Sequence, residues 1–79
     1  MTNEQKLVGC FSSALGVDKA QVVDSLQYNT IPEWDSVAHM TLIADLEGEF
    51  DVMIDTDQII EMSSVAKVRD ILKELEVRF

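Results

Sequence analysis

The feature that most constrains this chain is an unbroken helical pattern from Ser36 to Phe50, in the middle of the sequence. At about 100° per residue, one set of side chains falls on a single face, the pattern of a helix packed on a core. That face carries His39, Leu42, Ile43, Leu46 and Phe50. The only proline, Pro32, lies just before the pattern and marks the loop from which the helix begins. This stretch is therefore expected to be a helix with one face on the core.

The same periodicity predicts three further helices, at Asn3–Leu15, Thr56–Met62 and Val65–Glu76. Gly16 stands where a left-handed residue ends the first of them, and Ser63-Ser64 opens the last. The long stretch between the first two helices is predicted to be a loop with one helical turn near its start, pinned to the core by Leu26, Tyr28 and Ile31. The expected fold is all-α: a single domain over residues 1–79, built as a small bundle of three main helices and one short helix.

The chain is small and acidic. A protein of 79 residues buries only about 60–65% of its unfolded surface, so its core is thin. The net charge is −9, and no Lys or Arg occurs between Ala20 and Ala66. An acidic middle of this kind argues against nucleic acid and anionic membranes as partners and favours basic protein surfaces. The other interpretation is that the acidity only keeps a small protein in solution.

The single cysteine, Cys10, excludes a disulfide within the chain and a cysteine-based zinc site. It also indicates a reducing compartment, and we expect Cys10 to be a small semi-buried residue rather than a reactive thiol. The start of the chain is polar and lacks a basic segment, so no signal peptide is predicted. No apolar run approaches the ~20 residues of a membrane span. We therefore expect a cytoplasmic monomer that does not insert into membranes.

Asp35 and Ser36 stand at the start of the central helix. Both residue types begin helices, because their short side chains accept hydrogen bonds from N–H groups that have no intrahelical partner. A serine at this place also lies at the positive end of the helix dipole, with its hydroxyl at the rim of the fold. The position suits a phosphate ester, and simple capping is the alternative interpretation.

A second, smaller apolar stripe lies on nearly the opposite side of the central helix, formed by Val37, Met40 and Ala44 with Glu47 at its flank. A structural helix needs one apolar face, so a second face beside Ser36 indicates a partner. The alternative is the ordinary scatter of exposed apolar residues. His39 falls on the core side and is expected to be a packed or capping residue rather than a ligand.

No catalytic constellation is visible in the sequence. One His and one Cys on separate core faces make a poor nucleophile–base pair, and there is no glycine-rich phosphate loop or metal cluster. A calcium loop over the acidic residues fails on spacing, because it lacks the glycine at its sixth position and has Ile59 where an oxygen ligand is needed. We expect a protein on which enzymes act, not an enzyme. A weaker alternative is a divalent-ion binder that uses Asp51, Asp55, Asp57 and Glu61.

Two features carry a resemblance to a known family: the tetrapeptide Trp34-Asp35-Ser36-Val37, and the later spacing of Leu42, Leu46, Phe50 and Ile54. Together they resemble an acyl carrier protein, and the similarity covers nearly the whole chain. The resemblance implies that Ser36 is esterified by 4′-phosphopantetheine, which a phosphopantetheinyl transferase takes from coenzyme A with magnesium. The thiol of this arm then holds acyl groups as thioesters for enzymes of fatty-acid, polyketide or related biosynthesis.

The resemblance also implies roles for other residues. Asp35 would help to dock the transferase and orient its metal–phosphate centre, or would only cap the helix. The face shown to basic patches on acyl-loading and acyl-accepting enzymes would consist of Asp35, Val37, Met40, Ala44 and Glu47. A hydrophobic slot for an acyl chain would be lined by Leu46, Ile54, Ile59 and Met62.

Some residues depart from the family pattern. Val37 stands where Leu is common, Trp34 stands where Gly is common, and Ala38 and Thr41 replace residues that are acidic in many fatty-acid carriers. These departures point away from the housekeeping fatty-acid role and leave open a specialised carrier for a polyketide, amino-acid, lipid or polysaccharide pathway. A different class of function also stays open: an unmodified acidic helical module that binds a partner helix or groove through the second stripe.

Overall fold

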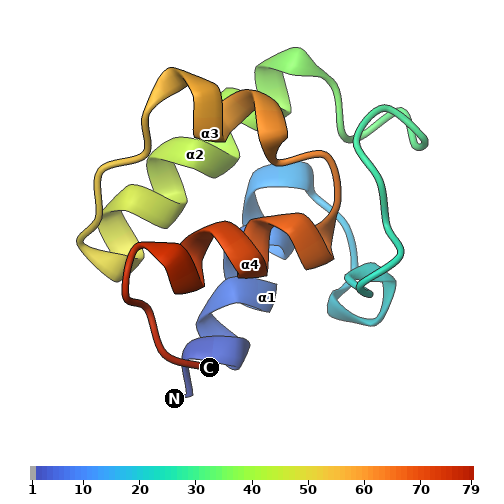
Figure 1. Cartoon of the computed structure of the whole chain (residues 1–79). Coiled ribbons are helices and arrows are strands. Elements are labelled where there is room, and N and C mark those ends of the chain that lie inside the picture. Colours follow the sequence, from blue (N-terminus) through green and yellow to red (C-terminus); the bar gives the residue numbers. More distant parts are fainter. Residues whose placement is uncertain (1) are drawn as a thin grey trace.

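Four α-helices and one short 3₁₀ turn follow one another in the computed structural model, which describes residues 2–79. Their bounds are α1 Asn3–Leu15, η1 Lys19–Gln21, α2 Ser36–Phe50, α3 Thr56–Glu61 and α4 Val65–Glu74. Figure 1 shows α3 lying across one end of α2, while the long α1–α2 loop runs along one side of the bundle. The predicted all-α architecture, three main helices and one short helix, is confirmed.

Each helix begins where a short polar side chain accepts a hydrogen bond from a free backbone N–H group. The capping residues are Thr2, Asp35, Asp55 and Ser64. Caps of this kind contribute about 1 kcal/mol each. Gly16 ends α1 with a left-handed φ of 68°, as its position in the sequence predicted. The helix starts are therefore set by local sequence.

Two helices end earlier than predicted. Helix α3 stops at Glu61, and Met62 follows it as a cap residue with a buried side chain. Helix α4 stops at Glu74 instead of near Glu76, because Glu76 takes a left-handed φ of 71°. The chain then turns so that the Val77 N–H donates to the Leu72 carbonyl at 2.9 Å and the Val77 side chain is buried. Burial of Val77 in the core thus replaces the last half-turn of the predicted helix.

The core is formed by the apolar faces of α1, α2 and α4, and the α2 face is the one predicted from the sequence. Its fully buried helical residues include Leu7, Phe11, Leu42, Leu46, Val68 and Leu72. The largest fully buried side chain, however, comes from the loop before α2: Trp34 is 0% exposed. None of the helices in the described part of the chain has the length and apolarity needed to cross a bilayer.

The α1–α2 loop is fastened to the segment that joins α3 to α4. The Tyr28 N–H donates to the Ser63 carbonyl at 2.8 Å, and the Val65 N–H donates to the Leu26 carbonyl at 3.0 Å. Leu26 and Ile31 are half-buried against the core, as predicted, whereas the Tyr28 ring is more exposed than expected of an anchor. This loop therefore has a fixed path up to the start of α2.

Polar contacts close the bundle at two further places. The Arg69 guanidinium on α4 contacts Glu4 of α1 at 2.8 Å and Asp24 of the loop at 2.6 Å. The pKa of Arg69 is raised, and the largest cause is its hydrogen bond to Glu4. Both carboxylates are largely exposed, so such pairs contribute little to stability. The Asn3 side chain donates to the Arg78 carbonyl at 2.8 Å, so the start of α1 lies beside the last residues of the chain (Figure 1).

Candidate functional site

Ser36 is the first residue of α2, and its side chain is exposed. The capping function belongs to its neighbour: Asp35 Oδ1 accepts a hydrogen bond from the Ala38 N–H at 2.8 Å. Within residues 2–79, the Ser36 hydroxyl makes no hydrogen bond, whereas Ser64 uses its own hydroxyl to cap α4 by accepting from the Lys67 N–H. Because Asp35 caps the helix, the Ser36 oxygen is left free at the positive end of α2.

A shallow groove begins at Ser36 and runs along the outer side of α2. Its most exposed apolar residues are Val37, at 74% of its full exposure, and Met40, at 55%. We call it the α2 groove, and it is lined by Ser36, Val37, Met40, Thr41, Ala44 and Asp45. The second apolar stripe predicted from the sequence is therefore exposed and lies directly beside the free hydroxyl.

The acidic residue at the edge of the groove differs from the one expected. Glu47, assigned to the partner face, is half-buried, and its Oε2 accepts a hydrogen bond from the Ile54 N–H at 3.0 Å. Its carboxylate thereby holds the loop between α2 and α3. Asp45 lines the groove instead. The signal for Asp45 was present in the sequence, because it follows Thr41 by four residues and so lies one helical turn further along the same side.

The four residues assigned to an acyl slot all belong to the apolar core, which is closed to the surface at this place. Leu46, Ile54 and Met62 are buried, and Ile59 is half-buried against the same cluster. The surface hollows described on this chain are lined by other residues. Leu46, Ile54 and Met62 are therefore not accessible from the surface in this structure.

Trp34 and His39 lie on the inner side of the site, beneath the start of α2. The Trp34 Nε1–H donates to His39 Nδ1 at 3.0 Å, and the two rings stack with centroids 6.0 Å apart. His39 Nε2 lies 3.0 Å from the Ile59 carbonyl oxygen of α3. His39 is therefore a packed residue with both ring nitrogens engaged, as expected, while the burial of Trp34 was missed.

Comparisons with known proteins assign no family to the chain. A scan against protein-family models finds no match, and a search of curated proteins finds none either. What the site offers chemically is one free hydroxyl on a capped helix start, with an apolar groove beside it and acidic side chains at the edge.

Two strongly exposed apolar side chains were not predicted. Met53, in the loop before α3, is 88% exposed, and Ile60 on α3 is 74% exposed. The signal for Ile60 was weak: two adjacent isoleucines cannot both face the core from one short helix, and Ile59 takes the inner place. These residues add to the apolar surface available for a partner.

Two of the four acidic residues considered for a divalent ion, Asp51 and Asp55, have local structural roles. Asp51 ends α2 with a left-handed φ of 54°, and Asp55 Oδ1 caps α3 by accepting from the Gln58 N–H. In residues 2–79, no three His, Cys, Asp or Glu side chains gather as a metal ion would require. The geometry gives the ion-binding alternative no support.

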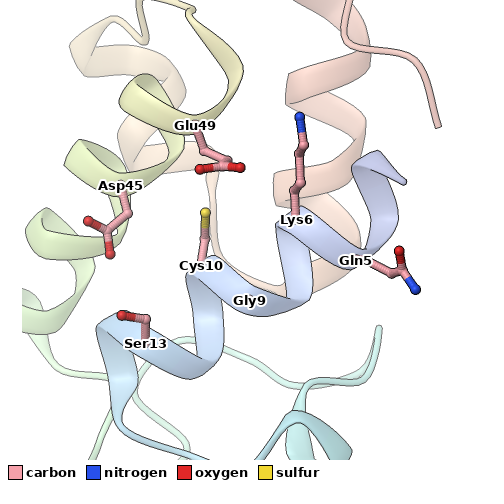
Figure 2. A pocket seen from close by; sticks show the side chains of 7 residues that line it. All are labelled: Gln5, Lys6, Gly9, Cys10, Ser13, Asp45 and Glu49. Atoms are coloured by element: carbon pink, nitrogen blue, oxygen red, sulfur yellow. The ribbon is translucent and has the colours of Figure 1, made fainter. Parts of the chain in front are cut away.

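Cys10 lies at a hollow between α1 and α2, which Figure 2 shows from close by. Its sulfur points toward Glu49, with Asp45 also across the hollow (Figure 2). Burial, followed by repulsion from Glu49 and Asp45, raises the pKa of the Cys10 thiol to about 11. The thiol stays neutral near neutral pH and is a poor nucleophile, as its sequence context predicted.

The raised pKa of Cys10 gives an alkaline effect on stability. Because the folded-state pKa lies above the ordinary value of 9.0, the neutral thiol favours the folded state below about pH 9, and this contribution is lost as the pH rises through about 11. We therefore expect the free energy of unfolding of wild type to fall more steeply over this range than that of Cys10→Ala. Urea unfolding at several alkaline pH values measures the difference. Parallel curves for the two proteins would contradict it.

Proposed function

We propose that this chain is a carrier protein of the acyl-carrier type, in which Ser36 bears 4′-phosphopantetheine. The observation that carries the proposal is the free, exposed Ser36 hydroxyl at the first position of α2. Asp35 caps the helix in its place, so modification of the serine leaves the helix start intact. The tetrapeptide Trp34-Asp35-Ser36-Val37 and the order of elements support the same assignment.

The attachment step needs groups that this chain does not provide. Ser36 Oγ attacks the coenzyme A phosphorus that carries the pantetheine arm, a P–O bond to serine forms, and the pyrophosphate P–O bond breaks to release an adenosine bisphosphate. The hydroxyl proton passes to a base. In the described chain no base is hydrogen-bonded to Ser36, so we assign the base and the magnesium ion to the transferase. The charge of the resulting phosphodiester is favoured at the positive end of α2.

The loaded arm would then work by recognition and mobility. Its thiol forms thioesters with acyl groups, and the α2 groove beside its attachment point supplies the contact for partner enzymes. Val37 and Met40 give an apolar centre, and Asp35 and Asp45 give acidic edges. Such a surface fits a partner with an apolar patch surrounded by basic side chains, and charge complementarity speeds the encounter.

The test is a transfer assay with a matched serine control. Wild type, Ser36→Ala and Ser63→Ala are each incubated with coenzyme A, magnesium and a broad-specificity phosphopantetheinyl transferase, and intact masses are recorded. Ser63 is an exposed serine outside the candidate site. Wild type and Ser63→Ala are expected to gain one phosphopantetheine, and Ser36→Ala none, while all three keep the same helical circular dichroism. An unmodified wild type, or a Ser36→Ala protein modified to the same extent, would contradict the proposal.

An unmodified interaction module is the second candidate, and the exposed side chains of Val37, Met40, Met53 and Ile60 favour it as well as the first. It would use the stripe of Val37, Met40 and Ala44 in the α2 groove to bind a partner helix or groove. The two candidates differ in one measurement: protein isolated from its native host carries the arm on Ser36 if the first is right, and has the bare mass if the second is right.

A further inference from the structure

A short chain of hydrogen bonds fixes the inner side of the start of α2. The indole Nε1–H of Trp34 donates to His39 Nδ1, and His39 Nε2 lies 3.0 Å from the Ile59 carbonyl oxygen. An indole nitrogen can only donate and a carbonyl oxygen can only accept. His39 is therefore a neutral imidazole with its hydrogen on Nε2, which donates to Ile59. Buried or half-buried polar groups in this chain of bonds are all paired.

Three separate parts of the molecule meet at His39. Trp34 belongs to the α1–α2 loop and is bonded within it. Its backbone carbonyl accepts from the Asn29 N–H at 3.0 Å, and its backbone N–H donates to the Ile31 carbonyl at 3.2 Å. The imidazole itself belongs to the first turn of α2. Ile59 belongs to α3, a helix of only six residues that is too short to be stable by itself. His39 thus holds the loop and α3 in fixed positions relative to α2.

Ser36 lies in the sequence between Trp34 and His39, the two residues whose side chains are hydrogen-bonded. It follows Trp34 by two residues and precedes His39 by three, while its own side chain makes no hydrogen bond within residues 2–79. The direction of the Ser36 hydroxyl therefore depends on the backbone between Trp34 and His39. The same connection sets how Ile60, the exposed residue next to Ile59, is placed relative to the α2 groove.

We propose that His39 is a positioning residue for the modification of Ser36, an inference that rests on the proposed function. It acts through Trp34 and Ile59: with both hydrogen bonds in place, Ser36 and the surface around it have one arrangement, which the transferase recognises. Without them, the loop and α3 take several arrangements, and only a fraction of the molecules can dock. The loss then appears as a higher apparent KM, because apparent affinity falls in proportion to the fraction that is competent to bind.

The experiment measures transferase kinetics on wild type, His39→Leu and His39→Asn. Leucine keeps apolar volume but can make neither hydrogen bond, whereas the asparagine amide oxygen can still accept from Trp34 in the place of Nδ1. We expect His39→Leu to raise KM about tenfold with little change in kcat, and His39→Asn to recover a large part of the loss. A His39→Leu protein whose KM stays within about twofold of wild type would overturn the proposal.

A matched control separates positioning from simple loss of stability. Val68→Ala truncates a fully buried side chain of α4 that takes no part in the hydrogen bonds of His39, and it destabilises the same core. Assayed at a temperature at which every variant is folded, Val68→Ala is expected to keep the wild-type KM. An equal rise of KM in Val68→Ala and His39→Leu would mean that His39 acts only through stability, and would overturn the proposal.

A spectroscopic readout stands apart from the transfer reaction. The chain has one Trp and one His, so the Trp34 indole N–H gives a single nuclear magnetic resonance signal. We expect slow exchange of this hydrogen with solvent in wild type and His39→Asn, and fast exchange in His39→Leu. If the wild-type protein gains no phosphopantetheine, the proposed function and this inference are both contradicted. A wild type that is modified normally, with an indole hydrogen as protected in His39→Leu as in wild type, overturns this inference alone.

Discussion

Replacing Trp34 with alanine is expected to lower the free energy of unfolding by about 3–5 kcal/mol, the largest effect of any single truncation in this chain. Trp34 is the largest fully buried side chain, and its ring packs edge-on against Phe11 with centroids 5.2 Å apart. Its removal also leaves His39 Nδ1 without a donor. A domain of this size has about 4–12 kcal/mol of stability in total, so the alanine variant is expected to be partly or wholly unfolded.

Urea unfolding followed by far-ultraviolet circular dichroism measures this effect, because the variant lacks the only tryptophan. Trp34→Phe keeps a buried ring and loses the indole N–H, and is expected to cost about 1–3 kcal/mol. Glu33→Ala, at an exposed position in the same loop, is the matched control and is expected to stay within about 0.5 kcal/mol of wild type. A Trp34→Ala protein that loses less than about 1 kcal/mol would show that the loop does not need this anchor.

Features that depend on neighbours in sequence were predictable. The cap at Ser64, the left-handed Gly16 and the inner face of α2 all follow from the spacing of a few residues. The exposed place of Ser36 at the head of α2 and the apolar stripe beside it followed in the same way. Both the helix start and the stripe are set within about two helical turns of sequence, which is the range over which periodicity carries information.

Features that depend on contacts between distant residues could not be predicted. Nothing near Trp34 in the sequence shows that its ring would lie against Phe11, because that contact joins two segments separated by the long loop. The sequence places Glu47 at the edge of the exposed stripe, but the α2–α3 loop folds back so that the Ile54 N–H donates to the Glu47 carboxylate. Helix α4 ended early for the same reason, since the burial of Val77 is a tertiary gain that no local pattern records.

Replacing Leu46 with alanine is the second large effect that we expect, a loss of about 2–5 kcal/mol in the free energy of unfolding. Leu46 is fully buried on the inner face of α2, in the same cluster as Ile54 and Met62. The truncation leaves an apolar cavity that water does not fill. Leu75→Ala, at a half-buried leucine beyond the end of α4, is the matched control and is expected to cost less. Urea unfolding of the two variants tests this order, and equal losses would contradict it.

The same variant tests the acyl slot that the family resemblance implies. If an acyl chain on the Ser36 arm enters the core beside Leu46, the Leu46→Ala cavity gives it more room, and an apolar chain in a dry apolar cavity is stabilising. An octanoyl group on the arm is then expected to raise the melting temperature of Leu46→Ala more than that of wild type or Leu75→Ala. Because Leu46 is fully buried in the unloaded protein, an acyl chain can enter beside it only by displacing core contacts. Equal shifts in all three loaded proteins would place the acyl chain outside the core, on the surface of the bundle.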